Sequence, residues 1–168
     1  MTWTSTSVPY FTPPEPGQPD PWTASGGTQR LLDVGVTVAP EDVRIALGLT
    51  AGAEVVRRSR LIVDAGEPME VATSYWPAEW ATGTALAETK PVKGGTVRLL
   101  ADMGRVAERS VEDVTAAIAD DTNCPEAPAG VALLVIKRTM YDAADQPFEC
   151  IMMYRWNGDP QRYVLKAD

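Results

Sequence analysis

The alternation of apolar and polar positions predicts two strand–turn–strand units of the same design, 79 residues apart. In each unit an apolar strand carrying cationic side chains enters a turn of small and acidic residues, and a second strand leaves that turn. Three matched pairs of residues mark the repeat: Pro68 and Pro147, Glu70 and Glu149, and Tyr75 and Tyr154. We therefore expect two hairpins, over 54–63 with 68–76 and over 131–141 with 147–156, that pair into one antiparallel sheet.

The rest of the pattern predicts a short list of further elements. In chain order these are a strand over 28–37, a helix over 41–47, a helix over 96–103 with Thr96 as its N-cap and Gly104 after its end, and strands over 106–118 and 162–166. Loops are expected at 77–93 and 119–130. Because the strands have hairpin spacings, we expect the α+β class, with a mostly antiparallel sheet and helices on one side of it.

The first 27 residues differ in composition from the rest of the chain. They hold six of the 14 prolines and no lysine or arginine, which predicts an extended or disordered segment. Four aromatic residues in it favour an arm that packs either on its own domain or on a partner subunit: Trp3, Tyr10, Phe11 and Trp22. We expect a proline-rich arm over 1–27 and one ligand-binding domain over 28–168.

Charge narrows the range of partners. The chain has 15 basic and 23 acidic residues in 168, a formal charge of −8, and 45% apolar residues. This balance repels phosphate backbones, so we expect no direct nucleic-acid contact by this chain alone.

No apolar run is long enough to span a membrane, and the N-terminus lacks the pattern of a secretion signal. The predicted location is the cytoplasm.

Histidine is absent, which removes the commonest general base and the commonest metal ligand. The two cysteines have no metal-site spacing, and Cys150 fits a buried strand position. No nucleotide-binding glycine pattern and no nucleophile elbow occur. We therefore predict no metal and no cofactor and assign no catalytic residue, and any catalysis would have to use carboxylates, tyrosine, lysine, arginine or backbone donors.

Arg58 and Arg60 lie two residues apart on a predicted strand, so both guanidinium groups share one face and can converge on an anion. The alternative is an exposed strand face balanced by nearby acids. Arg57 alternates to the opposite face and fits a structural role. Gly95 and Thr96 begin a helix whose free N–H groups suit a carboxylate or phosphate, although every capped helix has such an end.

Glu149 follows the second turn on an otherwise apolar strand, so it needs a cationic or hydrogen-bonding partner. A ligand amine or hydroxyl could supply it, and so could Lys137 or Arg138 on the paired strand. Tyr154 follows five residues later on the same strand. Thr73, Ser74 and Tyr75 close the first hairpin and offer hydroxyls that orient sugars or small acids.

The run over 55–77 resembles the signature of the UTRA domain, the effector-binding module of HutC-type GntR transcription regulators. Residues 94–104 are similar to its central helix, 110–117 to the next strand and 135–154 to its terminal hairpin. The resemblance implies a chorismate-lyase-like α+β fold, usually dimeric, with a pocket beside the sheet. It places effector anions at Arg58, Arg60 and Thr96, and effector amines or hydroxyls at Glu149, with Tyr154 or Arg155 nearby. No winged-helix segment precedes the module, so we expect a stand-alone protein whose partner is a DNA-binding regulator.

Three functions follow from this interpretation. The leading one is a dimeric sensor of a small anionic or polar metabolite. The second is a cofactor-independent lyase or cyclase that uses Glu149, Glu70 and Tyr154 as acid and base. The third is a dimerisation module with a degenerate pocket. The first depends on one expectation, that Arg58, Arg60 and Thr96 meet around a shared cavity.

Overall fold

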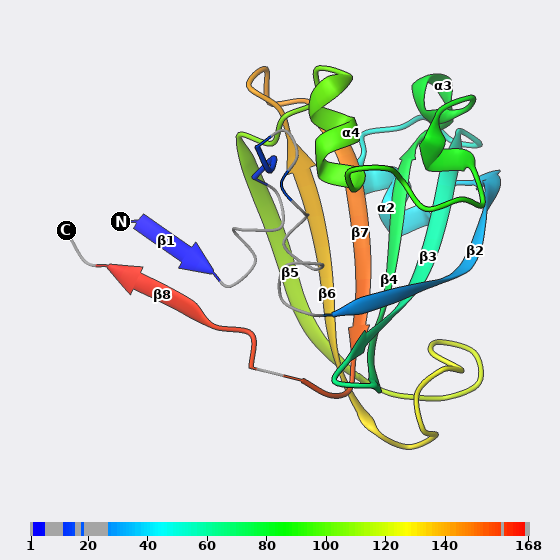
Figure 1. Cartoon of the computed structure of the whole chain (residues 1–168), viewed down its shortest axis with the longest axis vertical. Helices are drawn as coiled ribbons and strands as arrows, with labels where there is room; N and C mark the ends of the chain where they lie inside the picture. Colours follow the sequence, from blue (N-terminus) through cyan, green and yellow to red (C-terminus); the bar gives the residue numbers. More distant parts are fainter. Residues whose placement is uncertain (1, 6–11, 16–17, 19–26, 159, 167–168) are drawn as a thin grey trace.

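A computed structural model describes residues 2–5, 12–15, 18, 27–158 and 160–166. Its centre is a six-stranded antiparallel sheet in the order β2-β3-β4-β7-β6-β5 (Figure 1). The strands are β2 (Thr28–Val38), β3 (Glu54–Asp64), β4 (Glu67–Pro77), β5 (Arg109–Ile118), β6 (Ala132–Tyr141) and β7 (Pro147–Arg155). The helices are α2 (Glu41–Ala46), α3 (Ala78–Ala81), the 3₁₀ turn η2 (Ala85–Ala87) and α4 (Thr96–Asp102). The expected α+β class is confirmed.

The two predicted hairpins form the middle of the sheet. β3 pairs with β4, β6 pairs with β7, and the second strands of the two hairpins, β4 and β7, pair with each other. In that central pair Ala72 lies opposite Met153, and Ser74 lies opposite Ile151. The prediction that the hairpins join into one antiparallel sheet is confirmed.

Strand alternation gives the sheet two covered faces. On the face that we call the α4 face, Val56 and Trp76 pack with residues of α3, η2 and α4. On the opposite face, which we call the α2 face, Val55 and Tyr75 pack with α2. Figure 1 shows α4 in front of the sheet and α2 behind it. The expectation that helices cover one side is therefore wrong for α2, because β3 has valine on both faces and each face needs an apolar cover.

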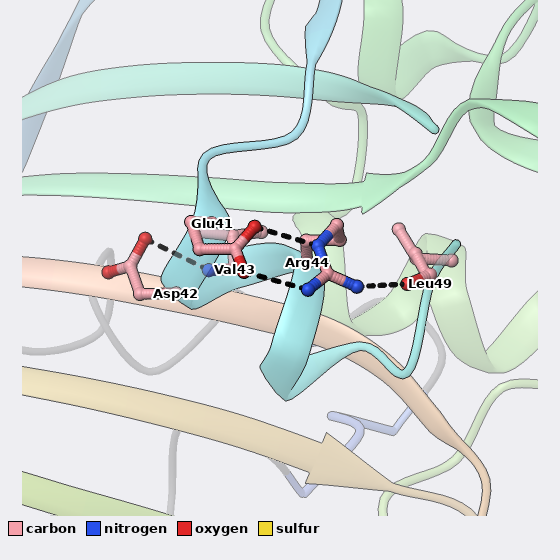
Figure 2. Close-up of polar contacts among 5 residues, drawn as sticks. All are labelled: Glu41, Asp42, Val43, Arg44 and Leu49. Atoms are coloured by element: carbon pink, nitrogen blue, oxygen red, sulfur yellow. Dashed lines mark hydrogen bonds and ion pairs between the residues drawn. The ribbon is translucent and has the colours of Figure 1, made fainter. Parts of the chain in front are cut away.

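α2 is short and is held at both ends by one side chain (Figure 2). Arg44 donates from Nε and Nη2 to the two carboxylate oxygens of Glu41, at 2.8 Å each, and from Nη1 to the Leu49 carbonyl oxygen at 2.8 Å. Arg44 thus joins the start of the helix to the turn after it. Val43, on the inner side of α2, is buried against the α2 face of the sheet.

Three local predictions need correction. The expected loop over 77–93 contains α3 and η2, the strand expected from 106 begins at Arg109, and the N-cap of α4 is Gly95 instead of Thr96. Gly95 has φ 85°, a conformation that glycine adopts without strain, and no side chain caps this helix. The loop over 119–130 is confirmed, and its Cys124 and Ala127 are buried against the α2 face.

The ends of the chain form a separate two-stranded ribbon, in which β1 (Thr2–Ser5) pairs antiparallel with β8 (Tyr163–Lys166) (Figure 1). Most of the predicted arm, over 6–11, 16–17 and 19–26, lies outside the described residues. The division into an arm and a domain therefore stays a prediction. None of the helices in the described ranges is long and apolar enough to cross a membrane.

Candidate functional site

Polar side chains from four neighbouring strands meet on the α4 face of the sheet. Arg58 and Arg60 come from β3, Ser74 from β4, Glu149 from β7 and Arg138 from β6. All five are on this face because their positions alternate in step across the paired strands. Arg60 Nη2 donates a hydrogen bond to Ser74 Oγ at 3.0 Å. The structure thus brings together four of the predicted site residues, Arg58, Arg60, Ser74 and Glu149.

Glu149 is the acid of this group, and its pKa departs strongly from the ordinary value. Its side chain is buried, and removal from water raises the pKa of its carboxyl from 4.5 to about 7. The charges of Arg60 and Arg138 and contacts with Ser74 and Trp76 oppose this rise. The Trp76 indole is near enough to act on this pKa, although its Nε1–H makes no hydrogen bond of normal geometry within the described ranges. Glu149 therefore changes protonation state near neutral pH.

Of the two basic residues on the paired strand, Arg138 lies on the same face as Glu149 and its charge acts on that carboxyl, whereas Lys137 does not share this face. Lys137 lies on the opposite face, where its Nζ is 3.1 Å from a carboxylate oxygen of Asp113. Arg138 is itself engaged, because its Nε donates to Glu112 Oε1 at 2.7 Å. Arg60 and Arg138 therefore do not serve Glu149 alone, because Arg60 also donates to Ser74 and Arg138 to Glu112.

Arg58 donates hydrogen bonds to backbone carbonyl groups. Its guanidinium, 4% exposed, donates to the carbonyl oxygens of Glu88 and Lys90, the latter at 2.8 Å, with a longer bond of 3.4 Å to Leu86. Burial and the nearby Arg60 charge lower the pKa of Arg58. Arg58 therefore fastens the segment over 86–90 to the sheet.

A hollow of about 260 Å³, which includes its open mouth, lies between α4 and the turn end of the β6–β7 hairpin. One buried carboxyl, Glu149, and one guanidinium, Arg105, are its charged groups. The rest of the lining is apolar: Pro13, Val97, Leu100, Val106, Ala107, Met140 and Phe148. A concave apolar site with few polar groups is the usual form of a small-molecule pocket, but this volume, which includes open solvent, lies below the usual range of about 300–1,000 Å³.

The other predicted contacts are spread over the domain. Thr73, Tyr75 and Tyr154 point to the α2 face, where Thr73 Oγ1 is 2.9 Å from Ser59 Oγ and the two tyrosines join apolar clusters. Arg155 pairs with the buried Glu70, at 2.6 Å between Nη2 and Oε2.

The helix start forms no part of the hollow. Gly95 and Thr96 begin α4, but Val97 is the residue of that turn that lines it. The shared anion site of Arg58, Arg60 and Thr96 therefore stays a prediction.

Sequence reasoning missed Arg105 as a lining residue of the hollow. The available signal was Gly104, which ends α4 with φ 78° and returns the chain toward the sheet. As for metals, the described part of the chain has no group of three or more histidine, cysteine, aspartate or glutamate side chains that could hold an ion.

The chain belongs to the UTRA domain family, whose model matches residues 27–159. An uncharacterized HTH-type transcriptional regulator of Streptomyces coelicolor is 33% identical over 102 residues, which are 56% of this chain and 38% of that protein. The chain thus spans well under half the length of that relative.

Solved structures share the fold. The effector domain of PhnF from Mycobacterium smegmatis matches with a TM-score of 0.67 at 24% identity, over 79% of this chain and 84% of that one. A GntR-family transcriptional regulator from Bacillus cereus matches with a TM-score of 0.64 at 16% identity, over 77% and 91%. These likenesses confirm the expected architecture of the sheet.

Proposed function

We propose that this chain is the effector-binding domain of a HutC-type GntR regulator, in which a small anionic or polar metabolite bound on the α4 face controls a DNA-binding region. Membership of the UTRA family supports the assignment, as does the likeness to an effector domain from Mycobacterium smegmatis. The observation that carries it is Glu149, a buried carboxyl at the wall of an open hollow. An acid kept only for stability has no need of an open, otherwise apolar space beside it.

Ligand-dependent thermal stabilisation tests this function. A ligand that binds only the folded state raises the melting temperature with its concentration. We expect at least one member of a panel of sugar phosphates, amino acids and small carboxylic acids to do so in the full chain. Glu149→Gln should weaken that hit, whereas Glu67→Gln on the exposed turn of the other hairpin should not. A panel without any stabilising compound would favour a pure dimerisation module.

We propose that the domain acts as a dimer. β5 is an edge strand of the sheet and exposes Val111, Val114 and Ile118 at 40%, 43% and 60%. A long apolar edge is a pairing surface unless something covers it. Sedimentation equilibrium should give a dimer that Ile118→Lys weakens. Ile45→Lys, at an exposed apolar position of α2 away from either sheet edge, is the matched control and should leave the mass unchanged.

The DNA-binding region would be supplied outside this acidic domain, which we propose to work in the cytoplasm without contacting nucleic acid itself. The formal charge of −8 supports this division of roles. A mobility-shift assay with the full chain alone should therefore show no retained DNA at physiological salt.

A second function, a cofactor-independent lyase or cyclase, is favoured by one feature. A glutamate with a pKa of about 7 is tuned for proton transfer at neutral pH. The two functions differ in the fate of the ligand. NMR of the mixture after incubation with the protein should return a stabilising compound unchanged if the chain is a sensor, and converted if it is an enzyme.

A further inference from the structure

Arg105 has a hydrogen-bond donor that no described residue satisfies. Its Nε atom is buried and has no partner among the described residues, and its guanidinium carbon lies 3.8 Å from the centroid of the Trp80 ring. Stacking on the indole fixes the plane of the guanidinium, and no acid in the described part of the chain forms an ion pair with it. A buried N–H without an acceptor costs free energy, which a bound acceptor would recover.

The position of Arg105 is set by the end of α4 and not by a flexible loop. Gly104 N donates to the Ala101 carbonyl at 2.9 Å, and Arg105 N donates to the Leu100 carbonyl at 2.8 Å. This pair of bonds, with Gly104 at φ 78°, is the Schellman motif that ends many helices. The backbone of Arg105 is thus held before any ligand arrives, which lowers the entropic cost of binding at this point.

The wall of the hollow that Arg105 lines also contains a second, different polar group. Glu149 is an acceptor when ionised and both donor and acceptor when protonated. The same lining includes the apolar side chains of Leu100, Val106 and Phe148. This combination is poorly suited to a polyhydroxylated sugar, whose many hydroxyls would lose their hydrogen bonds to water against such a surface.

Two other candidate anion contacts, Arg58 and Arg60, do not line the hollow, and Arg58 is engaged by the carbonyl groups of Glu88 and Lys90. Arg105 is therefore the better-placed cation. We propose, resting on the proposed function, that the effector is a small carboxylic acid with an apolar body. Its carboxylate accepts from Arg105, its body packs on Leu100 and Phe148, and a hydroxyl or ammonium group faces Glu149.

The test uses the full chain labelled with ¹⁵N and matched probes of increasing size. The probes are hydroxy and amino acids from lactate to 3-phenyllactate and phenylalanine, the methyl ester of each, and two sugar phosphates, glucose 6-phosphate and glucosamine 6-phosphate. Melting temperature detects binding, and the Nε–H resonance of Arg105, assigned through Arg105→Lys, reports contact. The ester comparison uses the unaltered protein, so it holds even if a substitution disturbs folding.

We expect at least one acid to raise the melting temperature and shift the Arg105 resonance, and its methyl ester to do neither. Loss of a charge-assisted hydrogen bond in Arg105→Gln should weaken binding of that acid about tenfold or more. Arg98→Gln, on the outer side of α4, is the control and should leave the affinity unchanged.

Other outcomes overturn the inference in distinguishable ways. Binding of a sugar phosphate that Arg105→Gln does not weaken would refute the carboxylic-acid assignment and leave the sensor function standing. Equal binding of acid and ester would refute the role of Arg105. Failure of every probe to raise the melting temperature would count against both proposals.

Discussion

Replacing Glu149 by glutamine should remove a pH dependence from the stability of the domain. The carboxyl has a pKa of about 7 when folded and 4.5 as a free side chain, so the folded state binds its proton more tightly than the unfolded state does. Stability from this group is therefore fully present below about pH 4.5 and is lost as the pH rises toward 7. At about 1.36 kcal/mol per pKa unit, the loss amounts to roughly 3 kcal/mol.

Urea unfolding followed by tryptophan fluorescence, repeated between pH 4.5 and 8, measures this loss. The charged groups that act on Glu149 are Arg60 on β3 and Arg138 on β6, and Arg105 lines the same hollow. Subtracting the Glu149→Gln curve from that of the unaltered chain cancels titrations common to both. The difference in unfolding free energy should fall by about 3 kcal/mol across the range and level off above pH 7. Two parallel curves would refute the burial argument.

Three further changes test the framework around the site, each by urea unfolding at constant pH. Arg58→Met should cost about 2 kcal/mol, because buried carbonyl groups of the segment over 86–90 lose their donor; no change would mean that water replaces it. Glu70→Ala should cost about 3 kcal/mol by leaving the partly buried Arg155 without its carboxylate, and adding Arg155→Met should restore part of that loss. Gly104→Ala should cost about 1 kcal/mol because alanine is strained at the positive φ of this position. A Cβ there meets no atom within 4 Å, so no steric clash adds to this cost. Unchanged stability would show that the turn adapts to alanine.

The sheet could be predicted from the sequence because its signals are local and repeated. Period-two alternation with a turn between strands places both hairpins, and the matched Glu70 and Glu149 correctly predict equivalent positions, since both lie buried on the α4 face. The two short helical segments of 77–93 were missed because four- and three-residue elements leave no periodic signal. Their formation depends on packing against Val56 and Trp76.

The site was harder to predict than the fold, because its geometry depends on which long-range partners each side chain finds. Alternation placed Arg58 and Arg60 on one face, but nothing local indicated that backbone carbonyls would occupy Arg58. Thr73 and Tyr75 have hydroxyls that suit a polar ligand, but the same period of two places them on the opposite face. The place of Arg105 in the lining of the hollow could not be predicted from the sequence, because it depends on the packing of α4, Trp80 and the β6–β7 hairpin.

The most direct test of the binding site is a crystal structure of the full chain with the tightest-binding compound from the probe panel. The account predicts density for the compound between α4 and Phe148, in contact with Glu149 and with an acidic oxygen at Arg105 Nε. A compound bound elsewhere, with this hollow unchanged and Glu149 untouched, would contradict it.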